Sequence, residues 1–288
     1  MNLKQAYSYA VQFLELNNVD EADFKALCLV CHLAGIKNSE YSLHINDEII
    51  MSRLAKSLWR LKEGEPLQYV LGKWDFYESE FYVGKGVLIP RPETEELVEK
   101  VIDYAKNLKN PVVYDLCSGS GCIGISIAKA VPEAVVYCIE KSDDAFYYLE
   151  KNVKGVSNVN IIHGDINDSF DIESADIIVS NPPYIKSGDI SSLQSEVLFE
   201  PEMALDGGID GFDFYRIIND KWADKLKPTG MLFLEIGNEQ GDGIKSVLTS
   251  FCDIRVVKDI YKNDRIVIAK PLDRNFCLLY TSDAADDR

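Results

Sequence analysis

The sequence has only three histidines, and none is paired with another possible ligand at the spacing of a metal site. Metal ligation therefore has little support, and we assign no metal site. Basic residues are also scarce, since 30 Lys and Arg stand against 47 Asp and Glu and the formal net charge is −17. A protein that clamps duplex nucleic acid needs a basic face, so we expect no direct nucleic-acid partner.

Long hydrophobic runs are missing as well. The start of the chain includes Lys4 and Glu15 without a sustained apolar core, so it does not predict a secretory signal. No segment offers the roughly 18 uninterrupted apolar residues that a membrane span requires. Without export features, the seven cysteines are expected to be reduced thiols. We therefore expect a cytoplasmic protein with no membrane partner. The oligomeric state is not indicated, and a monomer is the expectation.

The final residues do not continue the pattern that precedes them. Residues 275–288 look like the in-frame translation of a sequencing adapter, so we expect a non-native tail and exclude it from the fold. Without this tail the chain is still strongly acidic.

Residues 1–72 are expected to form an N-terminal helical domain. Apolar side chains recur at helical spacing in two segments, and a third helix is expected over residues 47–61. The residues expected to face the inside of this bundle are Leu3, Tyr7, Ala10, Leu14, Phe24, Leu27, Cys28, Cys31, Ile50, Leu54 and Leu58.

The rest of the chain is expected to be a linker followed by an α/β domain. Alternating residues predict a β-hairpin linker over residues 73–90, and strands and helices then alternate through residues 91–274. The expected strands are residues 112–116, 135–140, 159–163, 176–180, 231–236, 254–258 and 265–270, and one expected helix is residues 212–225. This alternation predicts a mostly parallel, seven-stranded sheet with helices on both faces. The last two strands could form an antiparallel hairpin.

The most informative motif is Asn181-Pro182-Pro183-Tyr184, which follows the apolar strand expected at residues 176–180. Ligands bind at the carboxyl ends of strands in open α/β sheets. The two prolines fix their own φ angles and push the residue before each of them into extended geometry. The resulting rigid turn presents one carboxamide, backbone carbonyls and an aromatic face, which suit a planar NH2 group such as an amide or a base amine. The alternative is a Pro-Pro turn that only ends a strand.

A glycine-rich loop at residues 115–124 joins the first strand of the α/β domain to a helix. Its three glycines satisfy the dinucleotide-binding pattern, and Glu140 follows the next strand, so an NAD-dependent dehydrogenase is a competing interpretation. However, Asp115 at the strand end would repel a pyrophosphate and suits a ligand with an ammonium or sulfonium group. S-adenosylmethionine has both, and Glu140 could accept its ribose hydroxyls. The remaining alternative is a glycine turn that only packs strand against helix.

Asp165 follows the third expected strand of this domain. Its carboxylate could accept a hydrogen bond from the adenine amine of the same cofactor. An ordinary turn cap is an equally good interpretation of a single aspartate at this position.

These motifs, in this order, resemble the class I S-adenosylmethionine-dependent methyltransferases that act on amino groups. Segments 65–72, 89–95 and 200–208 resemble more narrowly the peptide chain release factor glutamine methyltransferases. The resemblance covers residues 1–271. It implies a Rossmann-like, S-adenosylmethionine-binding catalytic domain preceded by a helical domain that recognises the substrate.

The resemblance also implies site residues. The cofactor-binding positions carried over are Cys117, Ser118, Gly119, Ser120, Gly121, Glu140, Ile166 and Asn181. The substrate-binding positions are Asn181, Pro182, Pro183 and Tyr184, of which Asn181, Pro182 and Tyr184 are expected to be catalytic. Two departures stand out: many members have Gly at Cys117, and many have an aromatic residue at Ile166, so adenine would be held here by aliphatic contact rather than stacking.

The implied activity is methylation of the side-chain amide nitrogen of the glutamine in the Gly-Gly-Gln motif of class I release factors, which are the expected partners. The Asn181 side-chain oxygen and the Pro182 carbonyl would each accept one amide N–H, with Tyr184 flat against the amide plane. The alternatives are glutamine methylation of a ribosomal protein, an adenine amino-methyltransferase, the NAD-dependent dehydrogenase, and a cofactor-sensing module without turnover. The negative charge disfavours the adenine alternative.

Overall fold

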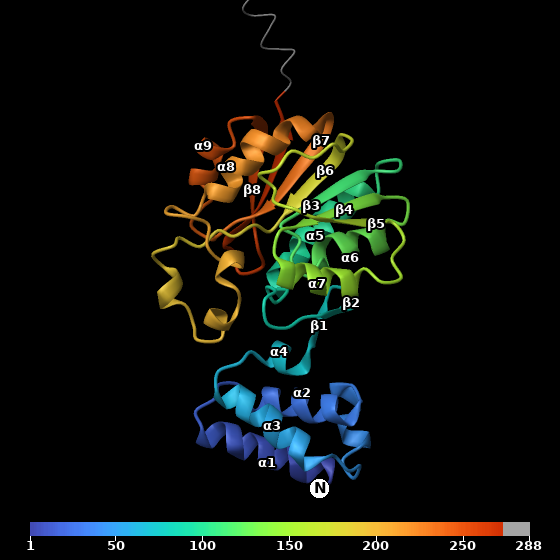
Figure 1. The fold of residues 1–288 in the computed structure, drawn as a ribbon, viewed down its shortest axis with the longest axis vertical. Helices are drawn as coiled ribbons and strands as arrows, with labels where there is room; N and C mark the ends of the chain where they lie inside the picture. Colours follow the sequence, from blue (N-terminus) through green and yellow to red (C-terminus); the bar gives the residue numbers. More distant parts are fainter. Residues whose placement is uncertain (273–288) are drawn as a thin grey trace, which may run out of the picture.

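The computed structural model describes residues 1–272, which form a smaller helical body and a larger α/β body (Figure 1). A narrow connection joins the two, so the molecule is elongated. The non-native tail predicted at residues 275–288 lies outside the described residues.

The smaller body consists of α1 (Leu3–Leu16), α2 (Ala22–Ala34), α3 (Met51–Lys62) and α4 (Leu67–Leu71). Helix α1 begins at Leu3 because Asn2 caps it. The Asn2 side chain accepts the Gln5 backbone N–H at 2.9 Å, and the Gln5 side chain accepts the Asn2 backbone N–H at 3.3 Å. Helix α2 ends where Gly35 takes a left-handed conformation with φ of 71°.

Most of the residues predicted to face inward do so, but two do not. Phe24 is 47% exposed and Ile50 is 58% exposed. Helix α3 begins at Met51 rather than near residue 47, so Ile50 precedes the helix and helical spacing does not govern where it points. Phe24 lies near the start of α2, where its side chain misses the face that packs on α1 and α3.

The predicted hairpin is present but shorter than the linker, as β1 (Lys73–Phe76) and β2 (Ser79–Tyr82) pair antiparallel. Phe76 and Phe81 of this hairpin are buried in the core of the larger body, together with side chains of α5 (Pro92–Ala105). Helix α5 begins at Pro92, where the missing N–H costs nothing.

The main sheet of the described chain has seven strands in the order β5-β4-β3-β6-β7-β9-β8. They are β3 (Val112–Leu116), β4 (Val135–Glu140), β5 (Val159–His163), β6 (Ala175–Ser180), β7 (Leu226–Glu235), β8 (Phe251–Lys258) and β9 (Asp264–Pro271). Strands β3 to β7 run parallel, and β9 runs antiparallel to both β7 and β8. The mostly parallel sheet and the final antiparallel hairpin are therefore confirmed.

Helices cover both faces of this sheet (Figure 1). Val113 of β3 belongs to one buried cluster with α5, α6 (Cys122–Ala130) and α7 (Asp143–Asn152). Its neighbour Tyr114 belongs to a second cluster with α8 (Asp213–Ile217) and α9 (Gly243–Val247). Successive side chains of a strand point to opposite faces, so the two clusters fill the two sides of the sheet.

One predicted helix and one predicted strand differ from the structure. The helix expected at 212–225 ends as α8 at Ile217 and continues through a π turn (Ile218–Trp222) and a 3-10 turn (Ala223–Lys225). Strand β7 begins at Leu226 rather than at residue 231, because an irregular pairing with β6 lets the strand include Pro228 and Gly230.

The order of strands reverses direction between β3 and β6. From β3 the chain proceeds outward through β4 and β5, then returns to place β6 on the other side of β3. Such a switch point opens a crevice at the carboxyl ends of the two strands. The glycine loop follows β3 and the Asn-Pro-Pro-Tyr motif follows β6, so the fold brings the two motifs to the same crevice.

Candidate active site

A cavity lies at the carboxyl ends of β3 to β6 and contains most of the predicted cofactor-binding residues. The predicted residues that line it are Cys117, Ser118, Gly119, Ser120, Glu140, Asp165, Ile166, Asn181 and Pro183. We call this the first cavity. Its wall combines the glycine loop, the ends of β4 and β5, and the turn after β6.

Glu140 is the acidic group that is held against the glycine loop. Its Oε2 accepts the Gly119 backbone N–H at 2.7 Å, and its Oε1 accepts the Ser142 backbone N–H at 2.7 Å. Burial raises the pKa of this carboxyl, while these hydrogen bonds oppose the rise. Each oxygen keeps a second lone pair, so the carboxylate can accept further hydroxyl donors at the cavity edge.

Asp115 does not reach the first cavity, contrary to the contact expected from its place at the end of β3. Its side chain is fully buried, and its Oδ2 accepts the Gly124 backbone N–H at 2.9 Å. Its Oδ1 is buried without a hydrogen-bond partner. Burial, opposed by the Gly124 hydrogen bond and assisted by the nearby charge of Glu140, raises the pKa of Asp115 to about 7. Asp115 therefore joins the loop to α6 and does not face a ligand.

Gly121 is likewise a packing residue and does not line the cavity. Its φ of 79° lies in the left-handed region, and a Cβ at this position would approach Leu149 Cδ1 to 2.4 Å. A side chain at this position would therefore force α6 and α7 apart.

Asp165 and Ile166 form the part of the wall that follows β5. Asp165 lies 2.8 Å from Lys141 Nζ and accepts the Asn167 backbone N–H at 2.9 Å, so it also serves as the turn cap that the sequence allowed. The Ile166 carbonyl accepts Trp222 Nε1–H at 2.9 Å, which fixes this turn against the second core cluster. The aliphatic side chain of Ile166 is almost fully buried.

A smaller second cavity adjoins the first at Asn181, which lines both. The residues that line the second cavity are Leu88, Arg91, Asn181, Pro182, Tyr184, Ile185, Val197, Ala204, Leu205 and Glu235. The Asn181 Nδ2 donates to Thr94 Oγ1 at 3.3 Å, which leaves its Oδ1 to accept from a ligand. The Tyr184 backbone carbonyl accepts Gln240 Nε2–H at 3.2 Å, and burial raises the pKa of its phenol.

Three functional candidates have no role in the sequence-based interpretation: Thr94, Glu200 and Glu235. Thr94 and Glu200 lie inside segments that carry the family resemblance, so their positions were visible but their partners were not. Glu200 forms an ion pair with Arg91 and accepts the Ile89 backbone N–H at 2.9 Å. A signal for Glu235 exists, since it is an acidic residue at the end of an otherwise apolar strand.

Residues 1–272 contain neither a cluster of metal ligands nor a membrane-spanning helix. That part of the chain places no group of three or more His, Cys, Asp or Glu side chains where they could hold a metal ion. No helix there is both long enough and apolar enough to cross a membrane.

Comparison with known proteins identifies the family. The PrmC N-terminal domain model matches residues 5–72, and the methyltransferase small domain model matches residues 94–207. The release factor glutamine methyltransferase of Thermodesulfovibrio yellowstonii is 39% identical over 83% of this chain and 89% of its own length. That of Aquifex aeolicus is 35% identical over 90% of this chain and 96% of its own length.

A solved structure shows the fold. The T. thermophilus 16S rRNA N2 G1207 methyltransferase, in complex with AdoMet and guanosine, superposes with a TM-score of 0.50 at 17% identity, over 69% of this chain and 50% of that one. The Rossmann-like methyltransferase fold is thereby confirmed. With the glycine loop, Glu140 and the Asn-Pro-Pro-Tyr turn brought to one crevice, and with relatives this similar over most of their length, the chain belongs to the release factor glutamine methyltransferase family.

Proposed function

We propose that the protein is an S-adenosylmethionine-dependent protein-(glutamine-N5) methyltransferase that acts on the Gly-Gly-Gln glutamine of class I release factors. The observation that carries the proposal is the position of Asn181, which lines two adjoining cavities. One cavity has the groups that a methyl donor needs, and the other is open to a side chain from a partner protein. The names of the relatives support the release factor as that partner.

The residues of the first cavity fit S-adenosylmethionine. Ser120 Oγ is buried without a hydrogen-bond partner in the wall of this cavity, which is typical of an atom that a ligand satisfies. Glu140 would accept the ribose hydroxyls, and Ile166 would contact the adenine. A Cβ built on Gly119 meets no atom closer than 3.9 Å, so the loop leaves open space there. When bound, the cofactor supplies an electrophilic methyl group on a sulfonium centre.

Asn181, Pro182 and Tyr184 would hold the glutamine amide in the second cavity. The amide nitrogen is a poor nucleophile because its lone pair is delocalised into the carbonyl. The Asn181 side-chain oxygen and the Pro182 carbonyl would each accept one N–H, which favours a pyramidal nitrogen with its lone pair aimed at the first cavity. Such orientation can supply up to about 7–11 kcal/mol of the barrier reduction.

The reaction needs no strong general base. The attacked nitrogen becomes cationic and therefore strongly acidic, so it can release its proton to water. The described residues that line the second cavity include neither histidine nor lysine, and their one carboxyl, Glu235, already accepts a hydrogen bond from Thr94.

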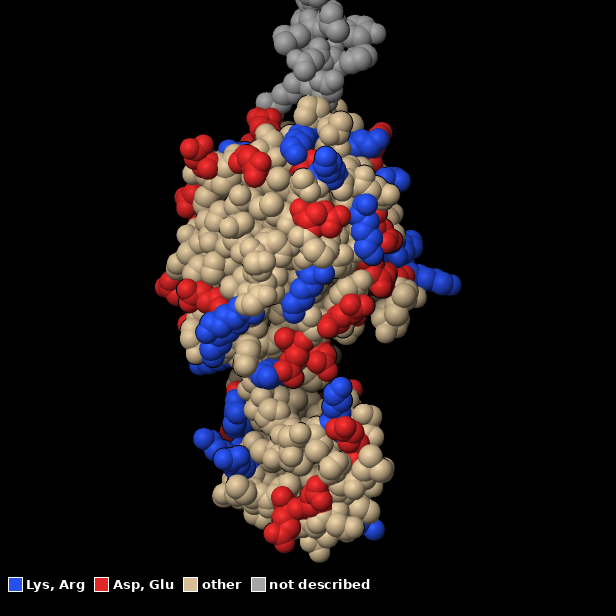
Figure 2. All heavy atoms as spheres, turned by 90° about the vertical axis from the view of Figure 1, so that its right-hand side faces the viewer, with Lys and Arg blue, Asp and Glu red and all other residues tan. Residues whose placement is uncertain are grey.

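The distribution of charge supports a protein partner rather than duplex nucleic acid. On the face shown in Figure 2, acidic and basic side chains are interspersed, and no continuous basic stripe crosses it. A release factor as substrate also implies that the enzyme works in the cytoplasm.

A labelled-methyl assay tests the proposed function. The purified protein is incubated with radiolabelled S-adenosylmethionine and, separately, a release factor, ribosomes or DNA. We expect label in the release factor and none in a variant whose Gly-Gly-Gln glutamine is replaced by glutamate. Label in a ribosomal protein or in DNA instead would contradict the substrate assignment.

A further inference from the structure

We infer that Thr94 and Glu235 form a hydrogen-bonded relay that sets the orientation of the Asn181 carboxamide, and that both are positioning residues for methyl transfer. This inference rests on the proposed role of Asn181 as the group that accepts the glutamine amide. It adds two residues outside the Asn-Pro-Pro-Tyr motif to the machinery, and neither needs to touch the reacting atoms.

The relay connects three separate elements. Asn181 follows β6, Thr94 lies in the first turn of α5, and Glu235 is the last residue of β7. The Asn181 Nδ2 donates to Thr94 Oγ1 at 3.3 Å, and Thr94 Oγ1 donates to Glu235 Oε2 at 2.7 Å. Thr94 and Glu235 are each 2% exposed, so bulk water does not compete for these bonds.

The direction of the two hydrogen bonds in the relay is set by the Glu235 carboxyl. Above its pKa Glu235 is an ionised carboxylate that only accepts hydrogen bonds, so Thr94 then gives its single proton to Glu235. The Thr94 oxygen is then an acceptor toward Asn181, which turns the Asn181 NH2 group toward Thr94 and leaves the carboxamide oxygen for the substrate. A carboxamide flipped by 180° would present its NH2 to the NH2 of the incoming glutamine, and two donors cannot pair.

The pKa of Glu235 is set by its burial and by the charges around it. Burial raises the pKa of this carboxyl to about 7, while the Thr94 hydrogen bond and the charges of Arg265 and Arg91 lower it and Glu93 raises it. Tyr184 also lies within electrostatic reach.

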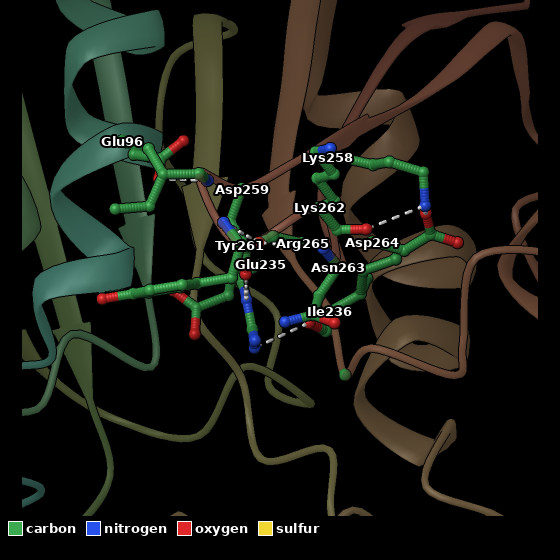
Figure 3. Close-up of polar contacts among 12 residues, drawn as sticks. Glu96, Glu235, Ile236, Lys258, Asp259, Tyr261, Lys262, Asn263, Asp264 and Arg265 are labelled. Carbon is green, nitrogen blue, oxygen red and sulfur yellow. Dashed lines mark hydrogen bonds and ion pairs between the residues drawn. The ribbon is translucent and has the colours of Figure 1, made fainter.

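Arg265 is itself fixed at this end of the sheet. Its Nε lies 3.3 Å from Asp259 Oδ2, and its Nη1 donates to the Ile236 carbonyl at 3.4 Å. Figure 3 shows Arg265 and Asp259 beside Glu235, where the guanidinium compensates the buried carboxylate. When Glu235 is ionised, the relay therefore ends in a buried charge that lies within electrostatic reach of a fixed cation.

Two substitutions at Thr94 distinguish the effect of its hydroxyl group from the effect of its packing. Thr94→Val keeps the shape and removes the hydroxyl, whereas Thr94→Ser keeps the hydroxyl. We expect T94V to lower the single-turnover methylation rate at saturating cofactor about tenfold, in line with a lost buried hydrogen bond. T94S should stay within about twofold of wild type, and Glu235→Gln, which can also donate to Thr94, should lower the rate severalfold.

The chain offers a matched control. Thr249 Oγ1 accepts Asn219 Nδ2–H at 3.3 Å, the same donor, acceptor and distance, and neither residue lines either cavity. Thr249→Val should leave the rate unchanged. The dissociation constant for S-adenosylmethionine should be close to wild type in all four variants. This measurement is the control for the fold, because a general loosening of the structure would weaken cofactor binding as well. Wild-type turnover in T94V, or equal losses in T94V and T94S, would overturn the relay.

A second readout does not depend on the substrate. The side-chain NH2 signals of Asn181, assigned by their loss in an Asn181→Ala variant, should show slower hydrogen exchange in wild type and T94S than in T94V. If these signals respond as expected while no variant methylates a release factor, the relay stands and the proposed substrate is wrong. If Asn181 exchange is the same in T94V and wild type, the relay is wrong even where the enzyme is active.

Discussion

The two cavities that adjoin at Asn181 differ in what encloses them. The first is lined by the glycine loop and by residues at the ends of β4 and β5, which the second lacks, and also by residues of segments 86–94 and 201–204. The second is enclosed by side chains from residues 88–91, 181–185, 197–205 and 235, which are distant in the sequence. A change within the loop can damage the first cavity directly, whereas the second can be damaged by breaking contacts that lie outside it.

Those outside contacts extend as far as the helical body. Glu200 holds the loop after the Asn-Pro-Pro-Tyr motif to Arg91 and to the Ile89 backbone. Glu196 of the same loop lies 2.5 Å from Lys25 Nζ of α2, a side chain that is almost fully buried. The loop that lines the second cavity is thus tied to the N-terminal helices, and it also lines part of the first cavity, whereas the glycine loop lines the first cavity only.

The largest effect is expected where the cavities meet. Asn181→Ala removes the acceptor that orients the glutamine amide, so we expect at least a thousandfold loss of methyl transfer, or about 4 kcal/mol. The unfolding midpoint should stay near wild type, because Asn181 makes one long hydrogen bond to the protein, and cofactor affinity by calorimetry should fall far less than methyl transfer, because Asn181 is only one of the residues that line the first cavity. Near-normal turnover in the labelled-methyl assay would contradict the proposed mechanism.

The difference between short motifs and contacts that are distant in the sequence also explains what the sequence could and could not predict. The glycine loop, Glu140 and Asn181 were predictable because each lies in a short motif at a strand end, and the fold class follows from alternating elements. Thr94 and Glu235 were not, because the bond between them joins residues 141 positions apart. Asp115 was misplaced for a related reason: a carboxylate at a strand end can point to either side of the turn, and only packing against Gly124 decides which.

Asp115 provides the next test, since the structure removes it from the cavity wall. Its pKa is about 7 in the folded protein against 3.8 for the free group, so between these pH values the folded state binds more protons than the unfolded state. The contribution of Asp115 to stability therefore falls as pH rises from about 4 to about 7 and is constant above that range. We expect the free energy of unfolding of Asp115→Asn, measured with urea, to rise relative to that of wild type by up to about 4 kcal/mol between pH 4 and pH 7.

Cofactor binding provides the control for that variant. Because Asp115 does not line the first cavity, D115N should bind S-adenosylmethionine within about threefold of wild type. A stability difference between D115N and wild type that is the same at pH 4 and pH 8 would show that folding does not raise the pKa of Asp115, and a large loss of cofactor affinity would restore it as a ligand-binding residue.

A smaller effect is expected at Glu140, which belongs to the first cavity only. Glu140→Ala removes the acceptor of two backbone N–H groups and of the ribose hydroxyls, so cofactor affinity should fall about 30-fold to 100-fold, or about 2–3 kcal/mol. Glu150→Ala, an exposed substitution on α7, is the matched control and should leave affinity unchanged. Equal affinities for E140A and E150A by calorimetry would exclude Glu140 from the cofactor site.

The smallest effect concerns Cys117, where this chain departs from many members of its family. Cys117 has a φ of 58°, a left-handed conformation that costs a residue with a Cβ about 1 kcal/mol relative to glycine. Cys117→Gly should therefore gain stability, but by less than that amount, because glycine also gives the unfolded chain more freedom. Cys117→Ala removes the same thiol without relieving the backbone, so the difference between the Gly and Ala variants in urea unfolding isolates the conformational contribution. Equal midpoints for the two variants would mean that the strain at Cys117 is no larger than the freedom that glycine adds to the unfolded chain, and that the backbone of the first cavity accepts a side chain there at no net cost.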